Sequence, residues 1–372
     1  MAEAIKRRAS RTIRVGRLVI GGSAPVSVQS MTKTDPEDVR ATLAQVRRLA
    51  AVGAQLVRLT VPSFAAAEAF KRVRAGSPVP LVADTHFDAR LAMAALEAGA
   101  DKVRVNPGTT RSDALRDFAR ESARRRVPVR IGVNSGSVYT RSGRGRDLAA
   151  DMVKAAVAAA RRFEDWGQPQ IVLSMKAPTV AETVRAYRLA AAKCELPLHI
   201  GVTAAGPQDL AEAKSFAALG ALLVDGIGDT LRFSFTGDPV PEVEAGLTLL
   251  RALGLRREGP ELWSCPTCGR CKIDLVRLVE RVRRAVADIE SPITVAVMGC
   301  VVNGPGEASA ADVGLAGTPD GAVLFAGGRR LRRIKGERAM VEALVREARK
   351  MAKSGRGRQA VGSGRKPPGR GN

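Results

Sequence analysis

One unit repeats along most of the sequence, and this repeat limits the fold more than any other feature. Each unit is a short run rich in β-branched residues, a glycine or polar turn, and an alanine- and leucine-rich amphipathic segment. Eight such runs precede Gly254, at residues 26–30, 56–61, 80–84, 102–106, 128–134, 170–176, 198–203 and 221–226. They predict a (β/α)8 barrel of the TIM type, and an open doubly wound sheet is the alternative fold.

The segments between these runs have helical periodicity, for example at residues 36–51, 147–166 and 179–193. Several end on a glycine, as expected of the residue that follows a helix. These glycines are Gly53, Gly99 and Gly220.

The pattern changes after Gly254. A polar link at 256–261 leads to a cysteine pair, an amphipathic helix at 273–289 and a strand at 293–298. We therefore expect a barrel domain at 1–255 and a small α+β iron–sulfur domain at 256–352. Residues 353–372 combine glycine, serine, proline and basic residues without an acid, which predicts a disordered basic tail.

Polar residues follow the apolar part of most predicted strands. In a (β/α)8 barrel, functional groups lie at the carboxyl ends of the strands. The residues at these positions are Gln29, Ser30, Arg58, Asp84, His86, Arg104, Asn106, Arg130, Asn134, Lys176, Arg232 and Ser234. A single arginine here is often structural, but five cations on one rim predict a phosphate or diphosphate ester as ligand.

Two further features bear on this rim. We expect the glycine loop at 226–230 to follow the eighth strand and to offer backbone N–H groups to phosphate. His86 is a candidate acid or base, whereas His199, between apolar residues, is expected to be a hydrogen-bonded core residue.

The cysteines predict a metal site. Cys265-Pro-Thr-Cys268 and the later run from Cys300 to Glu307 supply three thiolates and a carboxylate, a set suited to an iron–sulfur cluster. Because Cys271 extends the first pair, a Cys₄ zinc site stays an alternative. An odd number of cysteines, no apolar run long enough for a membrane span and no signal-peptide h-region favour a cytoplasmic protein.

The net charge of +23 raises the possibility of nucleic-acid binding. Much of the excess lies in the tail and in arginine-rich helical segments such as 124–126 and 281–284, which favours a solvated surface instead. Two other classes stay open: a hydrolase or aldolase barrel with a zinc knuckle, and an RNA-binding protein that uses the tail.

Several long segments resemble the 4-hydroxy-3-methylbut-2-en-1-yl diphosphate synthase family of the non-mevalonate isoprenoid pathway. They are Ser264-Cys-Pro-Thr-Cys-Gly-Arg270, Met298-Gly-Cys-Val-Val-Asn-Gly-Pro-Gly-Glu307, Val28-Gln-Ser-Met-Thr32, Gly226-Ile-Gly-Asp-Thr230, Ala83-Asp-Thr-His-Phe-Asp88 and Arg130-Ile-Gly-Val-Asn134. The resemblance covers about residues 10–350. It implies a two-electron reductive ring opening of 2-C-methyl-D-erythritol 2,4-cyclodiphosphate with loss of water. A divergent iron–sulfur barrel enzyme with another phosphorylated substrate is the alternative.

The resemblance also assigns roles. A [4Fe-4S] cluster would be bound by Cys265, Cys268, Cys300 and, through oxygen, Glu307, with Cys271 as a spare. Glu307, Asp84 and His86 would be catalytic. Substrate ligands would be Arg58, Arg104, Arg130, Asn134, Lys176, Arg232 and Ser234. The chain has Ala204 where relatives have a glutamate, and smaller departures at Lys33, Thr109 and Pro178.

The expected partners follow from motifs and topology. No dinucleotide-binding glycine motif or P-loop is present, so a flavodoxin or ferredoxin would supply electrons. The last barrel helix should leave the chain at the face opposite the substrate, and a link of about ten residues reaches roughly 35 Å at most. We therefore expect a head-to-tail homodimer in which each cluster caps the partner's barrel.

Overall fold

The computed structural model describes residues 5–86, 88–107, 115–136, 138, 147–203 and 206–354. It divides into two compact units, with the boundary between Arg256 and Arg257. Each unit has its own hydrophobic core.

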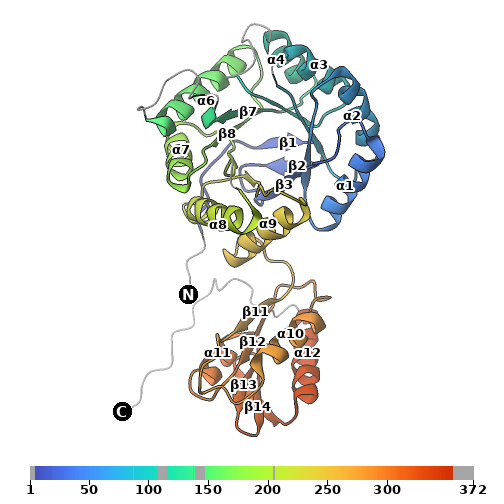
Figure 1. The fold of residues 1–372 in the computed structure, drawn as a ribbon. Helices are drawn as coiled ribbons and strands as arrows, with labels where there is room; N and C mark the ends of the chain where they lie inside the picture. Colours follow the sequence, from blue (N-terminus) through green and yellow to red (C-terminus); the bar gives the residue numbers. More distant parts are fainter. Residues whose placement is uncertain are drawn as a thin grey trace. The chain divides into compact units, whose positions relative to one another are not determined.

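The first unit is a ring of eight parallel strands (Figure 1). These strands are β3 (Ser27–Met31), β4 (Leu56–Thr60), β5 (Leu81–Asp84), β6 (Lys102–Val105), β7 (Val129–Asn134), β8 (Ile171–Lys176), β9 (His199–Ile200) and β10 (Thr230–Leu231). Their order is β8-β7-β6-β5-β4-β3-β10-β9, and a parallel bridge between Leu173 and Leu198 joins the two ends. The barrel prediction is confirmed, and the open sheet is wrong.

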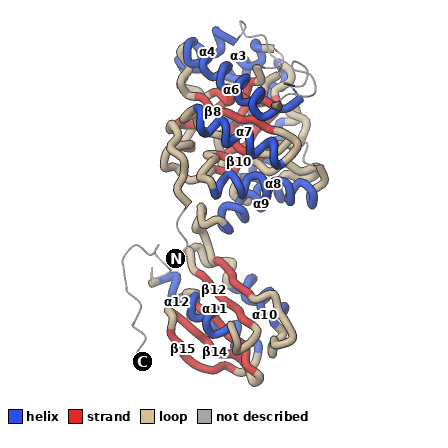
Figure 2. Tube along the Cα trace, turned by 90° about the vertical axis from the view of Figure 1, so that its left-hand side faces the viewer, coloured by secondary structure: helices blue, strands red, loops and turns tan. Residues whose placement is uncertain are grey.

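Helices surround the strands, as Figure 2 shows for α6, α7 and α8. The described helices of this unit are α1 (Val39–Ala51), α2 (Phe64–Gly76), α3 (Ala89–Glu97), α4 (Leu115–Arg124), α6 (Leu148–Asp165), α7 (Val180–Lys193), α8 (Gln208–Val224) and α9 (Val240–Ala252). Several begin where a side-chain oxygen accepts an N–H of the first turn, as Asp147 does for α6 and Thr179 for α7. The three helices predicted at 36–51, 147–166 and 179–193 are confirmed.

The predicted eighth strand at 221–226 is wrong. These residues form the end of α8 and its cap, and the strand is β10, further along. Leu222 and Leu223 are buried on a helix face, and a short apolar run does not distinguish a buried helix from a strand. Gly220 accordingly lies inside α8, whereas Gly53 and Gly99 follow helices with φ of 99° and 85°. The glycine loop at 226–230 therefore precedes the last strand instead of following it.

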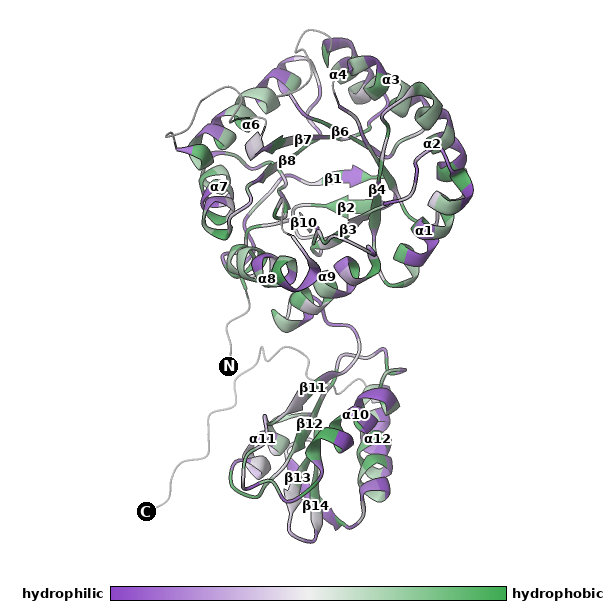
Figure 3. Ribbon diagram, viewed as in Figure 1, coloured by the Kyte–Doolittle hydropathy of each residue, from purple (hydrophilic) through white to green (hydrophobic). Residues whose placement is uncertain are grey.

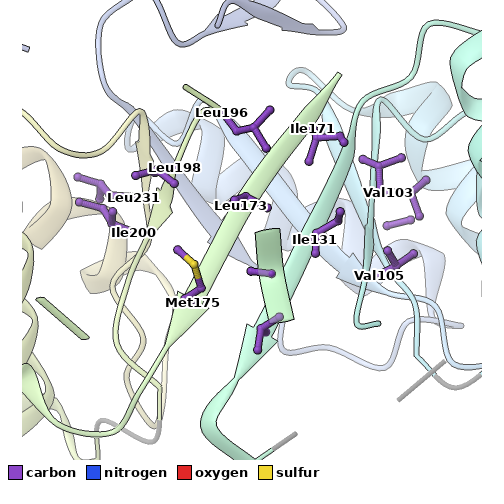
Figure 4. Packing of buried hydrophobic residues seen from close by; sticks show 14 of the residues in the cluster. Val103, Val105, Ile131, Ile171, Leu173, Met175, Leu196, Leu198, Ile200 and Leu231 are labelled. Atoms are coloured by element: carbon purple, nitrogen blue, oxygen red, sulfur yellow. The ribbon is translucent and has the colours of Figure 1, made fainter. Parts of the chain in front are cut away.

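Apolar side chains fill the space between strands and helices and close one end of the barrel. Val103, Ile131 and Leu173 belong to the apolar core between the strands and the helices (Figure 4). The surrounding helices have both hydrophobic and hydrophilic residues (Figure 3). The hairpin of β1 (Ile13–Val15) and β2 (Leu18–Ile20) packs on Leu56, Val82 and Val172 at the amino end. The carboxyl end is thus the end available to a ligand.

The second unit is a five-stranded mixed sheet with helices on both faces. Its elements are β11 (Glu261–Ser264), α10 (Leu275–Ala285), β12 (Thr294–Met298), α11 (Gly304–Ala310), β13 (Val313–Thr318), β14 (Gly321–Ala326), β15 (Arg329–Ile334) and α12 (Glu337–Lys353). The strands lie in chain order, β11 to β13 parallel and the last two antiparallel. The α+β prediction is confirmed, although α10 is shorter than the predicted 273–289. None of the helices in the described part of the chain has the length and apolar content to cross a bilayer.

Candidate active site

A cavity of about 320 Å³ lies at the carboxyl end of the barrel strands. All nine barrel residues that the sequence proposed as catalytic or substrate-binding line it. They are Arg58, Asp84, His86, Arg104, Arg130, Asn134, Lys176, Arg232 and Ser234. Gly132, Ser174, Val202 and Thr203 complete the lining.

Strand register brings these side chains together. On β7, Arg130, Gly132 and Asn134 alternate with outward residues, so all three face the interior. Arg104 on β6 lies opposite Arg130, and Asn134 lies opposite Lys176 on β8. Neighbouring strands therefore deliver cationic and amide groups to the same level of the barrel.

Asp84 is the carboxylate of the cavity lining. Its Oδ1 accepts a hydrogen bond from Arg104 Nη1 at 3.1 Å, and its Oδ2 lies 3.5 Å from Arg58 Nε. His86 Nε2 is 3.5 Å from Oδ1 and 2.5 Å from Arg104 Nη1. Burial acts to raise the pKa of Asp84, but Arg58, His86 and Arg104 outweigh it and hold this pKa well below its usual range. Asp84 is therefore ionised at neutral pH.

Two glycines make room for the cations. A Cβ on Gly132 would lie 2.6 Å from Arg104 Nε, and a Cβ on Gly201 would lie 2.7 Å from Lys176 Nζ. The Gly201 position also approaches the Arg232 carbonyl oxygen at 2.8 Å. Any larger residue would therefore displace a charged group from the cavity.

Arg58 and Arg232 share a sulfur contact that the sequence analysis missed. Met31 Sδ lies 2.8 Å from Arg58 Nη2 and 3.4 Å from Arg232 Nη1. Met31 belongs to the Val28–Thr32 segment, but a thioether gives no sequence signal for an anion site.

Glu242 is a second missed residue, and its position explains how Arg232 is held. It lies in the first turn of α9 with a fully buried side chain. Its Oε2 is 3.3 Å from both Nε and Nη2 of Arg232, and its Oε1 accepts from the Phe235 N–H at 3.1 Å. Lys33 Nζ also lies 2.9 Å from Oε1. The departure at Lys33 thus has a structural role beside the cavity.

Positive charge dominates the lining. Five basic side chains, Arg58, Arg104, Arg130, Lys176 and Arg232, surround the carboxylate of Asp84 in the described lining. Burial lowers the pKa of Lys176 well below its usual value, and Arg130 and Arg58 lower it further. Burial also lowers the pKa of Arg232, to about 10 despite Glu242, so this group keeps its charge at neutral pH. A ligand with several negative charges would relieve this repulsion.

Other predicted rim residues have different positions. Ser30 lies 3.4 Å from Glu242 Oε2, and Gln29 is buried with no partner for either amide atom among the residues that the structure describes. The glycine loop at 226–230 does not reach the rim, because Asp229 binds Arg7 and Ser10 near the N-terminus. The expectation that this loop contacts phosphate from the position after the last strand is wrong.

His199 is buried, as expected, but its imidazole ring is not hydrogen-bonded within the described part of the chain. Its exposed fraction is 0%, and both ring nitrogens lack a partner among the described residues. Burial lowers its pKa well below the usual value, followed by the charges of Arg130 and Lys176. Ala204 and Thr109 lie outside the described residues, as does the predicted tail beyond Ser354.

Cysteines gather at one edge of the second unit. Strands β11 and β12 are parallel neighbours, so Cys265 and Cys300 follow the same end of the sheet. The Gly299 N–H donates to Cys265 Sγ at 3.3 Å. The Arg270 N–H and then the Arg270 side chain lower the pKa of Cys268, and the Arg270 guanidinium also interacts with Cys300. Electropositive surroundings of this kind favour thiolates.

Cys271 and Glu307 differ from these thiols. Cys271 Sγ donates to the Ile273 carbonyl at 3.2 Å and packs beside Gly299 and Leu275, which favours a packing role. Glu307 is exposed on α11. Within the described residues, no three His, Cys, Asp or Glu side chains already stand close enough to hold a metal ion. The donor set nevertheless fits an iron–sulfur cluster, because two loops with three thiols face each other at one sheet edge.

Together these features define a (β/α)8-barrel protein with a cavity lined by basic side chains and a separate thiol-bearing α+β domain. The chain belongs to the GcpE family: the GcpE TIM-barrel domain matches residues 10–247, and the GcpE protein C-terminal domain matches residues 261–350.

Curated relatives cover nearly the whole chain. A "4-hydroxy-3-methylbut-2-en-1-yl diphosphate synthase (flavodoxin)" of Geobacter sulfurreducens is 49% identical over 92% of this chain and 98% of its own length. A relative with the same name in Lawsonia intracellularis is 45% identical over 93% of this chain and 97% of its own. A dihydropteroate synthase structure from Stenotrophomonas maltophilia is similar in fold, with a TM-score of 0.50 and 17% identity over 66% of this chain and 98% of that one.

Glu242→Gln should destabilise the free protein by about 3 kcal/mol, because it removes one partner of a buried ion pair. Urea unfolding measures this change. Added pyrophosphate should stabilise the variant at least as much as the parent, since the ligand supplies the lost negative charge. Glu244→Gln, at an exposed position of the same helix, is the matched control. Equal unfolding midpoints for Glu242→Gln and the parent would contradict the role assigned to Glu242.

Proposed function

We propose that the protein catalyses the two-electron reductive ring opening of 2-C-methyl-D-erythritol 2,4-cyclodiphosphate to 4-hydroxy-3-methylbut-2-enyl diphosphate, with loss of water. The observation that carries this proposal is the cavity lined by four arginines and a lysine on a barrel of the GcpE family. The names of the relatives agree with it. The reaction belongs to non-mevalonate isoprenoid biosynthesis.

The cavity suits both ends of this reaction. Each phosphate of the cyclic substrate carries one negative charge, and guanidinium groups bind such oxygens two at a time. Breaking the ring C–O bond frees a terminal phosphate oxygen, so the ligand gains negative charge as the ring opens. Arg58, Arg104, Arg130, Lys176 and Arg232 then bind the opening ring more strongly than the closed one. That difference lowers the barrier.

In this proposal, proton transfer is assigned to other residues than the binding of the phosphates. The substrate hydroxyl leaves as water and therefore needs a proton. Asp84, being ionised, does not supply it but fixes Arg104 and His86 beside the ligand. His86 Nε2 lies 2.5 Å from Arg104 Nη1 and 3.5 Å from Asp84 Oδ1, so both groups fix the position of its ring. His86 and Glu307 are the proposed acid–base groups.

We propose a [4Fe-4S] cluster bound by Cys265, Cys268 and Cys300, with Glu307 on the fourth iron. When bound, such a cluster supplies the two electrons of the reaction. A carboxylate is a harder and more exchangeable ligand than a thiolate, which would keep one iron accessible. The arrangement is supported by the two facing loops and by Arg270 between Cys268 and Cys300.

Reduced flavodoxin is the proposed electron donor, since the relatives carry that donor in their names. Ferredoxin is the alternative. The absence of a dinucleotide motif from the sequence is consistent with an external protein donor.

The first test is turnover. Anaerobically reconstituted protein, supplied with reduced methyl viologen and the cyclic diphosphate, should oxidise viologen at an ordinary enzymatic rate, roughly 1 s⁻¹ or more. Arg130→Met should lower kcat/KM at least about a hundredfold, because it removes a buried ligand of phosphate. Arg120→Met, exposed on α4, is the control. An intact cluster without turnover would point to a divergent barrel enzyme with another phosphorylated substrate.

The second test concerns the cluster ligands. Replacing Cys265, Cys268 or Cys300 by alanine should empty the site of iron and acid-labile sulfide, whereas Cys271→Ala should retain both. Glu307→Gln should keep a cluster with an altered Mössbauer signal at one iron, because only its oxygen ligand changes. A Cys271→Ala protein without iron would show that Cys271 binds metal together with Cys265 and Cys268. That result would favour the Cys₄ alternative.

We also propose a head-to-tail homodimer in which each cluster serves the partner's pocket. Helix α9 runs antiparallel to the strands, and Arg256 Nη1 lies 3.3 Å from Gln55 Oε1, before β4 begins. The chain thus leaves the barrel at its amino end, and the pocket lies at the other. The span from Arg256 to Cys265 is at most about 30 Å. To reach its own pocket, the link would have to pass along the outside of the helices to the other end of the barrel. A cluster supplied by the partner chain needs no such path.

Mixed dimers test this arrangement. When Arg130→Met and Cys300→Ala chains are co-expressed, one site of each mixed dimer is intact if sites are shared, and about a quarter of the parental activity should return. Each variant alone should be inactive. Mixed dimers that form but stay inactive would show that every chain uses its own cluster.

A further inference from the structure

The interior of the barrel holds a group of buried polar atoms without hydrogen-bond partners among the described residues. They belong to Ser27, Gln29, Lys102, Arg130, His199 and Thr230. Thr230 pairs in register with both Ser27 and His199, so the neighbouring strands β3, β10 and β9 contribute to this group, and β6 and β7 add Lys102 and Arg130. We call these six residues the polar floor. Buried polar groups are normally satisfied, so the floor is suited to bound water.

Lys102 is the most unusual member of the polar floor. It is the first residue of β6, its exposed fraction is 0%, and its Nζ has no hydrogen-bond partner among the described residues. The charges that act on it are the cations Arg130 and Arg58. An ammonium group without a carboxylate, beside two guanidinium groups, is costly to bury. The amine is therefore neutral in the ligand-free protein, in keeping with a pKa that burial and then Arg130 lower well below the usual value.

Arg130 connects the polar floor to the substrate cavity. It lines the cavity, yet its Nε and Nη1 atoms are among the unsatisfied atoms of the floor. After burial, the charge of Arg130 also has the largest effect on the pKa values of both Lys102 and His199. A phosphate paired with Arg130 would offset the positive charge that, after burial, does most to lower the pKa of Lys102.

We propose that Lys102 is a positioning residue that takes up one proton from solvent when the dianionic substrate fills the cavity. The step converts the amine to an ammonium and consumes one proton. Protonation of Lys102 adds positive charge next to Arg130 only while the ligand is bound. The ligand-free protein therefore does not contain this further buried cation. This inference rests on the proposed function of the same cavity.

Other titratable and charged groups face this interior from each neighbouring element. They are Arg58 on β4, Asp84 on β5, His86 after it, Arg104 on β6, Arg130 on β7, Lys176 on β8, His199 on β9, Arg232 after β10, Tyr187 on α7 and Glu242 on α9. Lys176 and His199 also have lowered pKa values, so they can add to the proton uptake. The test must therefore isolate the share of Lys102.

The sign of the pH dependence follows from linkage. A bound dianion raises the pKa of Lys102 above its value in the free protein. Between these two values, binding takes up a proton, and affinity falls up to about tenfold per pH unit as pH rises. Lys102→Met, which keeps the length of the side chain without the amine, should lose this contribution.

Calorimetry provides the test. The cyclic diphosphate is titrated into the oxidised holoenzyme, without reductant, in buffers of equal pH and different ionisation enthalpy. The slope of binding enthalpy against ionisation enthalpy gives the protons taken up. The parent should take up about one proton more than Lys102→Met, as expected for loss of one titrating group. Lys71→Met, at an exposed position on α2, should match the parent.

Each outcome decides the point. Equal proton uptake by the parent and Lys102→Met would overturn the inference, as would a parent that binds without uptake. A parent that does not bind the cyclic diphosphate would instead overturn the proposed function. Met removes an unsatisfied buried amine, so this variant should melt no lower than the parent. Lys102→Leu serves as the second uncharged replacement should Lys102→Met fail to fold.

Discussion

The concentration of buried positive charge at one end of the barrel is the constraint on which the other features of this unit depend. Four arginines and a lysine line the cavity, and the carboxylates of Asp84 and Glu242 offset only part of the positive charge. Burying unpaired charge is costly, so a chain that keeps this arrangement must derive an advantage from it when a ligand binds. A ligand with two phosphates provides that advantage, because each phosphate replaces repulsion between guanidinium groups by paired hydrogen bonds.

The scaffold is adapted to this charge in several places. Gly132 and Gly201 leave space for Arg104 and Lys176, and the apolar β1–β2 hairpin closes the opposite end of the barrel. Glu242 connects Arg232 to Lys33, and so links the loops that follow the first and last strands. These features help to hold the basic side chains in place. They leave hydrogen-bond donors of these side chains available to a ligand.

The sequence predicts the cavity lining well because one rule covers it: polar residues late on parallel strands face the carboxyl end of a barrel. Asp84, Asn134 and Lys176, the last residues of their strands, all follow from that rule. Glu242 does not, because it acts from the first turn of a helix, where an acidic residue is common for reasons of the helix dipole alone. Lys102 does not either, because it is the first residue of its strand. A lysine at that position is usually expected to be exposed to solvent. The eighth strand was misplaced since Ala221-Leu-Leu-Val224 is apolar enough for both a strand and a buried helix, and only packing decides between them.

The two units solve different parts of one chemical problem. Reductive opening of a cyclic diphosphate needs a place for growing negative charge and a source of electrons, and the two demands conflict, because cations that bind phosphate do not deliver electrons. The barrel meets the first demand with fixed guanidinium groups, which are rigid and always charged. In the proposed function, the second unit would meet the other with an iron–sulfur cluster held by thiols on loops, where Cys265 and Cys300 follow neighbouring strands. Separating the two on different folds lets the polar floor and the cavity be tuned electrostatically without disturbing the thiolates.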